Sequence, residues 1–285
     1  MHEKKSIFLW LLICLLTGLF GSSCKGKIYE ERDECPCLLK IGFENSKNID
    51  CYRIWIFDEE ENLLKQEMFT PSEAGELYET TIPRCIFKVY VWGNVGDNTL
   101  FSYNGTSSML KQNRSSSLDR LYFGNAKGSC LKREVLSLQV EMCKQYATVE
   151  LNISCSAKSS MNVKQLTAHT ITNSIGYYLN GNTIEGIGAI YTATPSSLDE
   201  TEDNIVLSFE YNMARPVSFN GMSIELNDGI KDILAVNMGK LLKNGNYDIK
   251  KRNLNDIKVD LNLSTGICLI SCKEWEETDD VDIVM

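Results

Sequence analysis

Histidine is almost absent from this sequence, which has two among its 285 residues. His2 lies in the N-terminal leader described below, so the rest of the chain contains His169 alone. A serine or cysteine nucleophile needs a general base such as histidine, and no serine lies in a G-x-S-x-G motif. The alternating stretch L-T-A-H-T-I predicts that His169 is an ordinary sheet residue. We therefore expect a protein that is not an enzyme and uses no cofactor.

Other signatures of site chemistry are also missing. No H-E-x-x-H motif of a zinc protease is present. Gly186 and Gly188 lie in E-G-I-G-A-I, but no strand and helix flank them as in a phosphate-binding loop, so we predict a turn. The acidic run at residues 58–61 has the oxygen ligands that Ca²⁺ prefers, yet a solvated hairpin tip explains it without an ion. Nothing in the sequence selects a pair of catalytic carboxylates.

Positive charge is in deficit. The chain has 29 Lys and Arg against 38 Asp and Glu, for a formal net charge of -9. Lys4 and Lys5 lie in the leader, so the rest of the chain is more acidic still. Phosphate backbones are bound by basic surfaces. The charge balance therefore argues against nucleic acid as a partner.

Long apolar runs are limited to one, at residues 6–20, which follows Lys4 and Lys5 and precedes Gly21, Ser22 and Ser23. This order is typical of a secretory signal peptide. The run is shorter than the roughly 20 apolar residues that a membrane-spanning helix needs. The next residue, Cys24, has the position of the cysteine that receives diacylglycerol in a bacterial lipoprotein.

We therefore predict a signal peptide at residues 1–23, lipidation of Cys24 and a linker at residues 24–36. Several acyl chains, at about 0.8 kcal/mol per buried methylene, would hold the chain on a membrane. Gly21 departs from the aliphatic residue usual three positions before that cysteine. The alternative is plain secretion after Ser23.

The C-x-x-C pair of zinc ribbons and redox helices is absent, although the chain has eleven cysteines. Removing Cys14 with the leader and assigning Cys24 to lipid leaves nine. Nine is odd, so at least one cysteine stays free or pairs between molecules. Structural disulfides, buried thiols and a zinc site joining the C-x-C and C-x-x-x-C pairs all remain open. The nine are Cys35, Cys37, Cys51, Cys85, Cys130, Cys143, Cys155, Cys268 and Cys272.

Helical periodicity is rare, and alternating apolar and polar residues predict strands along nearly the whole chain. Only residues 232–243 show modest helical spacing, and residues 97–120 predict a long loop. We expect two β-sandwiches in tandem, over residues 37–143 and 144–285, and the strands at 134–143 and 147–155 to pair with each other. The predicted strands cover residues 38–43, 52–57, 77–82, 85–92, 121–123, 134–143, 147–155, 165–172, 175–179, 189–194, 204–211, 222–226, 247–250, 256–263 and 267–272.

The order of these motifs resembles the FimB/Mfa2 family of fimbrial anchor lipoproteins from Bacteroidetes. The motifs are I-Y-E-E-R-D-E-C-P-C after the lipoprotein cysteine, I-W-I-F-D-E-E-E-N and F-K-V-Y-V-W-G-N in early strands, and I-S-C-K-E-W near the end. The resemblance covers essentially the whole chain after the leader. It implies an all-β fold of two transthyretin-like β-sandwich domains. It also implies a lipid anchor in the outer membrane, no catalysis, and a place at the base of a fimbria, where the protein fastens the shaft and limits its length.

Subunits of such fimbriae are thought to join by strand complementation, which predicts fimbrial shaft subunits as partners. Residues 279–285 have a suitable pattern, because Val281, Ile283 and Met285 fall on one face and Asp280 and Asp282 on the other, although Val284 breaks the alternation. The alternative is that this segment forms the last strand of its own domain. A second functional alternative is a surface lipoprotein that binds a glycan or host protein through Tyr177, Tyr178 or Trp275, although core packing also explains these aromatics.

Overall fold

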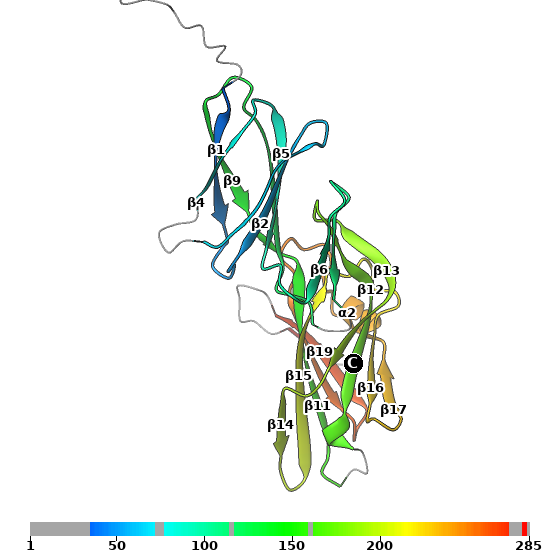
Figure 1. The fold of residues 1–285 in the computed structure, drawn as a ribbon. Coiled ribbons are helices and arrows are strands. Elements are labelled where there is room, and N and C mark those ends of the chain that lie inside the picture. The colour runs from blue at the N-terminus through cyan, green and yellow to red at the C-terminus, as the bar shows by residue number, and fades with distance from the viewer. Residues whose placement is uncertain (1–34, 72–76, 114–116, 159–161, 274–280, 284–285) are drawn as a thin grey trace, which may run out of the picture. The chain divides into compact units, whose positions relative to one another are not determined.

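β-strands dominate the computed structural model, which describes residues 35–71, 77–113, 117–158, 162–273 and 281–283 (Figure 1). The residues from Pro36 to Met285 form one compact unit. The predicted all-β class is confirmed. The count of two domains and the boundary after residue 143 stay predictions.

Two sheets form the first half of this unit. The smaller sheet has the order β4-β1-β9, in which β1 is antiparallel to β4 and parallel to β9. The larger sheet has the order β10-β8-β5-β2-β3. Their strands are β1 (Cys37–Glu44), β2 (Tyr52–Asp58), β3 (Leu63–Phe69), β4 (Leu77–Ile82), β5 (Ile86–Gly93), β8 (Tyr122–Ser129), β9 (Val135–Glu141) and β10 (Cys143–Lys144).

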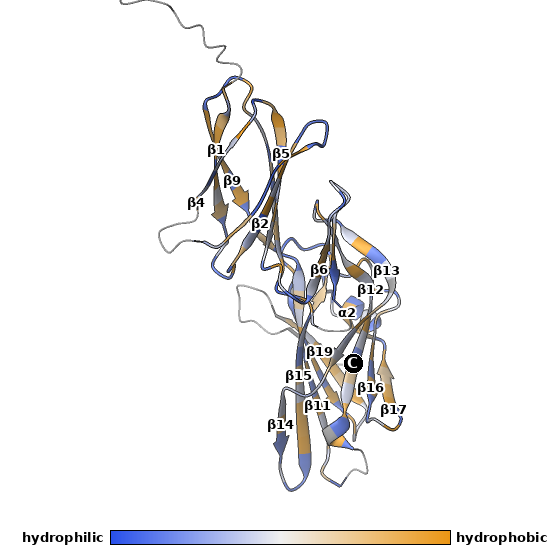
Figure 2. Ribbon diagram, viewed as in Figure 1, coloured by the Kyte–Doolittle hydropathy of each residue, from blue (hydrophilic) through white to orange (hydrophobic). Residues whose placement is uncertain are grey.

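Alternation of apolar residues builds the core between these sheets. Leu39 and Ile41 of β1 are fully buried, as are Phe87 and Val89 of β5. Gly128 lies opposite Phe87 on the neighbouring strand and leaves room for the Phe87 ring, since an added Cβ would lie 2.6 Å from that ring. Figure 2 shows hydrophobic residues concentrated in strands such as β1 and β5, with mostly hydrophilic loops between strands.

Two larger sheets form the second half. One has the order β14-β15-β11-β18-β19-β20, and the other has the order β17-β16-β12-β7-β6, with β13 also paired to β12. A short helix, α2 (Met238–Asn244), and one 3-10 turn, η1 (Val163–Gln165), accompany them. The strands are β6 (Thr99–Ser102), β7 (Met109–Gln112), β11 (Tyr146–Ser156), β12 (Thr167–Tyr178), β13 (Thr183–Ala193), β14 (Ser197–Glu200), β15 (Asn204–Ala214), β16 (Ser223–Asn227), β17 (Asp232–Val236), β18 (Asp256–Asn262), β19 (Ile267–Lys273) and β20 (Val281–Ile283).

The hairpin β6–β7 lies where the sequence predicts a long loop, so that prediction is wrong. Its strand β7 pairs with the end of β12, with Leu110 opposite Tyr177. Leu110 is fully buried. The residues around β7 are rich in Ser, Asn and Gly, so the local sequence gives no sign of this strand, which long-range pairing stabilises. An early segment therefore completes a sheet made mainly of late strands.

The predicted pairing of residues 134–143 with residues 147–155 is also wrong. Strand β9 pairs with β1, and β11 pairs with β15 and β18. Between β9 and β11, Cys143 and Lys144 of β10 pair with β8 instead of forming a reversing turn. The chain therefore passes from one pair of sheets to the other at this point.

Smaller differences have local causes. Residues 232–243 form β17 and then α2, whose N-cap Asn237 accepts a hydrogen bond from the Lys240 N–H. Residues 247–250 form a turn and not a strand. Gly186 and Gly188 lie inside β13, where its register against β12 is irregular, and not in a turn. Strand β3 escaped prediction because its exposed, charged residues lack clear alternation.

Candidate functional site

Cys24, the predicted lipidation site, lies outside the described residues, as do the leader and most of the linker. The described chain begins just before β1, whose first residue is the buried Cys37. Among the residues that the structure describes, no helix is long and apolar enough to cross a membrane. Lipidation of Cys24 therefore stays a prediction.

The predicted polymerisation strand is placed in part. Val281 and Ile283 belong to β20, which pairs antiparallel with β19 so that Ile283 lies opposite Ile270. Met285 lies outside the described residues. Strand β20 is the last strand in the order of its sheet, so it occupies an edge. This is the arrangement of a domain's own last strand, and the polymerisation role stays a prediction.

A hollow lies on the outer face of the same sheet. Its volume is about 380 Å³, and apolar side chains of Val206, Ile267 and Leu269 contribute to its lining. Ile267 is half exposed. A hydrogen bond of 2.9 Å from the Asn152 amide to the Asp260 carboxylate borders it. This sheet therefore combines a short edge strand, β20, with a hollow whose lining extends from β15 to β19.

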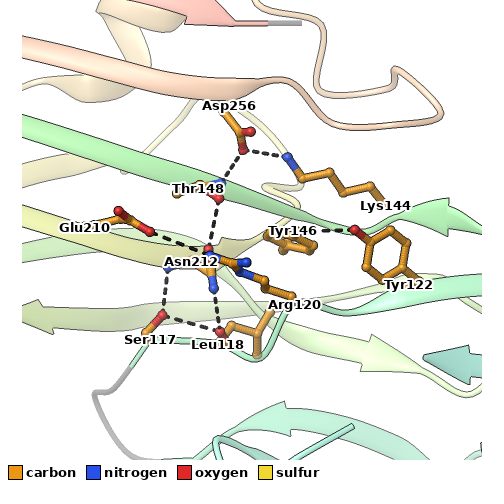
Figure 3. A network of polar contacts seen from close by, with 10 residues as sticks. All are labelled: Ser117, Leu118, Arg120, Tyr122, Lys144, Tyr146, Thr148, Glu210, Asn212 and Asp256. Atoms are coloured by element: carbon orange, nitrogen blue, oxygen red, sulfur yellow. Dashed lines mark hydrogen bonds and ion pairs between the residues drawn. The ribbon is translucent and has the colours of Figure 1, made fainter. Parts of the chain in front are cut away.

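A group of polar side chains, which we call the polar junction, lies where β10 leads into β11 (Figure 3). It comprises Ser117, Lys144, Thr148, Asn212 and Asp256. The Lys144 ammonium is 1% exposed and lies 2.5 Å from an Asp256 oxygen, which also accepts the Thr148 N–H at 2.7 Å. The Thr148 hydroxyl donates to the Asn212 side chain at 3.0 Å, and the Asn212 N–H donates to the Ser117 hydroxyl at 2.8 Å.

An aromatic ring lies against the lysine of the polar junction. The Lys144 ammonium lies 4.7 Å from the centre of the Tyr146 ring, a distance typical of a cation–π contact. Burial lowers the pKa of Lys144, and the Asp256 carboxylate opposes that shift. Burial and the hydrogen bond with Tyr122 raise the pKa of Tyr146. The junction therefore holds a paired buried charge, which is a structural arrangement and not one that offers a nucleophile to solvent.

A second set of contacts links the two halves of the unit. The Tyr177 hydroxyl donates to the Gln145 carbonyl and accepts the Arg215 N–H at 2.6 Å. The Arg215 guanidinium donates to the carbonyls of Ile249 and Lys251, each at 2.7 Å. These bonds fix the connection from β10 to β11, the end of β12 and the loop before β18 against one another.

The other candidate residues divide between core and surface. His169 lies half-buried in β12, as predicted, with a ring nitrogen 3.0 Å from the Thr192 hydroxyl. Tyr177 is fully buried in the core, whereas Tyr178 is 39% exposed. Trp275 lies outside the described residues. The Asp58 carboxylate accepts the Asn62 N–H at 2.8 Å, which stabilises the expected hairpin turn.

Sequence reasoning missed the polar junction altogether. Lys144 lies in C-K-Q-Y, which is typical of a turn between two strands, and a buried lysine gives no pattern by which it can be recognised. The sequence shows the cysteines but not which of them lie close together in the fold. Cys37, Cys85 and Cys130 meet at one end of the first two sheets. Among the described residues, no group of three or more His, Cys, Asp or Glu side chains could hold a metal ion.

Several solved structures share this arrangement of strands. The fimbrial anchor protein Mfa2 from Porphyromonas gingivalis has a TM-score of 0.57 and 12% identity, over 88% of this chain and 96% of that one. A candidate adhesin from Bacteroides thetaiotaomicron has a TM-score of 0.62 and 16% identity, over 87% of this chain and 98% of that one. A candidate polysaccharide-binding protein from the same organism has a TM-score of 0.63 and 11% identity, over 88% and 98%. These likenesses show the shared all-β fold.

The class defined by this fold is therefore that of all-β proteins built from several packed sheets. The family model of fimbrillin-A associated anchor proteins Mfa1 and Mfa2 matches residues 33–281. The chain belongs to this family, which confirms the resemblance seen in the sequence. No curated protein matches the chain. Family membership supports a fimbrial anchor or adhesin role.

Proposed function

We propose that this protein is a lipid-anchored fimbrial anchor subunit that attaches the fimbrial shaft to the outer membrane and limits its length. The family match over residues 33–281 carries the proposal. The leader and Cys24 supply the means of attachment, since several acyl chains bind a bilayer stably. The family is structural, so the protein acts by holding and not by catalysis.

We propose further that residues 279–285 join this protein to a shaft subunit by strand complementation, in which the segment leaves β19 and completes the sheet of that subunit. In this structure, β20 pairs with β19 at Ile270, Ser271 and Cys272. A strand paired over so few of the described residues costs little to detach, and main-chain hydrogen bonds to the sheet of the shaft subunit would replace those lost. Val281 and Ile283 alternate with acidic residues, so they would supply the side chains that enter pockets of that sheet.

The experiment that tests attachment is intact-mass analysis and membrane fractionation of the native protein and of Cys24→Ala. We expect acyl mass on a native chain that begins at residue 24, and release of Cys24→Ala from the membrane with shed fimbriae. Cys14→Ala is the matched control, because it changes a cysteine of the leader without touching the lipidated position. A native chain without acyl mass, or a Cys24→Ala protein retained on the membrane, contradicts the proposal.

A glycan-binding function has weaker support. It would use exposed aromatic platforms, and of its candidate residues Tyr177 is buried and Tyr178 is 39% exposed. Membership of the anchor family supports the fimbrial role instead.

A further inference from the structure

Three cysteines meet at the end of the first two sheets where the chain enters from the linker. Cys37 begins β1, Cys85 lies in the connection from β4 to β5, and Cys130 directly follows β8. The Cys130 thiol donates to the Cys85 carbonyl at 3.3 Å and to the Pro83 carbonyl at 3.4 Å, and Pro83 directly follows Ile82, the residue that pairs with Cys37. Cys130 is thus the shared neighbour of the other two.

The surrounding bonds fix Cys130 in this position. Its N–H donates to the Cys85 carbonyl at 3.0 Å, and its sulfur accepts the Cys85 N–H at 3.3 Å. Its thiol also lies 3.4 Å from the Pro83 carbonyl oxygen. After Cys130 the chain turns into β9, where the Glu134 carbonyl accepts the Leu38 N–H at 2.8 Å. Cys37 and Cys130 are therefore held at the same end of the core from two facing sheets.

We propose that Cys37 and Cys130 form a disulfide bond that joins the two sheets at the entry of the chain. Both side chains are 0% exposed, whereas Cys85 is partly exposed. Cys85 already engages Cys130 through its backbone N–H and carbonyl, so it needs no covalent bond to keep its place. A disulfide uses two of the three cysteines in this group, so one thiol is left over, and we assign that thiol to Cys85.

Formation of the bond removes one proton from each thiol and two electrons in all. The acceptor is the disulfide of an exported thiol oxidoreductase, which is reduced to a dithiol as the S–S bond forms. Burial raises the pKa of Cys37, and raises that of Cys85 to about 11, with Cys130 adding to both shifts. Buried protonated thiols react slowly. The exchange therefore takes place during folding, before the core closes.

The bond has a mechanical consequence, which rests on the proposed anchor function. Tension from a lipid at Cys24 reaches the folded unit at Cys37. Without a covalent bond, that tension would peel β1 from its first pairs, Cys37 with Ile82 and Leu38 with Val135. A disulfide transfers the load directly to Cys130, beyond the end of β8. The strand nearest the membrane is then protected from unzipping.

The test is peptide mapping of the full-length, membrane-extracted protein, alkylated and digested with trypsin without reduction. The three cysteines fall in separate peptides, at residues 33–40, 85–88 and 128–132. We expect residues 33–40 linked to residues 128–132, and loss of that link after reduction. A link between residues 85–88 and 128–132, or an alkylated Cys130, overturns the proposal.

Substitutions assign the link within residues 33–40, which contain both Cys35 and Cys37. Cys35→Ser must keep the link and Cys37→Ser must lose it; the reverse result overturns the proposal. Cys155→Ser is the matched control, because Cys155 is also buried but lies in β11. If the link is present on a protein without acyl chains, the anchor function fails and the disulfide stands. If the protein is acylated but lacks the link, the disulfide fails and the anchor function stands.

Discussion

The indole N–H of Trp92, in β5, donates a hydrogen bond of 2.9 Å to the carbonyl of Leu179, directly after β12. The Trp92 ring also packs against Phe123 and Tyr177, with ring centres 4.9 Å and 5.3 Å away. One side chain thus joins a strand of the first half of the unit to the end of a strand in the second half. For a protein proposed to bear tension, this contact makes the two halves a continuous structure.

Replacing Trp92 with Phe should destabilise the protein by about 2 kcal/mol more than the same change at Trp55. Both indoles are fully buried, but the Trp55 N–H has no hydrogen-bond partner among the described residues. The loss of ring volume is common to both variants. Only Trp92→Phe leaves a buried carbonyl without its donor, which typically costs about 1–3 kcal/mol. Urea unfolding measures the difference, and equal losses would show that the Trp92 bond contributes nothing.

The ion pair of the polar junction predicts an asymmetry between its partners. Asp256→Asn leaves Lys144 buried without a countercharge, which should cost about 3 kcal/mol. Lys144→Met should cost less, because Asp256 is 32% exposed and keeps the Thr148 N–H. The double variant should be more stable than Asp256→Asn alone. Chemical denaturation of the three variants checks this order.

The exposed pair of Lys40 and Glu79 is the control for that experiment. Its atoms lie 2.7 Å apart, but its side chains are 32% and 44% exposed. Lys40→Met should therefore change stability by less than about 1 kcal/mol. If Lys40→Met costs as much as Asp256→Asn, burial of Lys144 is not the cause.

Gly176 is needed for the hairpin β6–β7 to reach β12. Its φ is +143°, and an added Cβ would collide with the carbonyl oxygen of Leu110. Gly176→Ala should therefore cost about 3 kcal/mol and expose the hairpin to proteolysis. Gly188→Ala is the control, since its φ of +72° is also positive but no atom lies within 4 Å of the added Cβ. That control should cost about 1 kcal/mol, and equal proteolysis of both variants would show that β7 docking does not depend on Gly176.

Deleting residues 279–285 tests the role proposed for the C-terminal strand. We expect the truncated protein to fold, since β20 pairs with β19 at the sheet edge, and to lose capture of fimbrial subunits in pull-down. Val281→Asp with Ile283→Asp should reproduce the loss, whereas Asp280→Asn with Asp282→Asn should not. Normal capture by the folded, truncated protein would end the hypothesis that this segment donates a strand.

The sequence by itself determined many of the strands and the class of protein. Alternation of apolar residues predicted strands matching β1, β2 and β5 closely, because the in-and-out period of a strand is a local property. Scarce histidine argued against nucleophilic catalysis and acidic charge argued against nucleic acid as a partner. Diffuse motifs were sufficient to indicate the family that was then confirmed.

Only the tertiary structure decided which strands pair and which polar groups are buried. The fold brings together residues that are far apart in the chain, such as Leu110 and Tyr177, Lys144 and Asp256, and Cys37 and Cys130. A local pattern reports which face a side chain occupies, but not which distant segment covers that face. Which strands pair depends on the total apolar surface that the complete sheets bury. A short window of sequence does not contain that information.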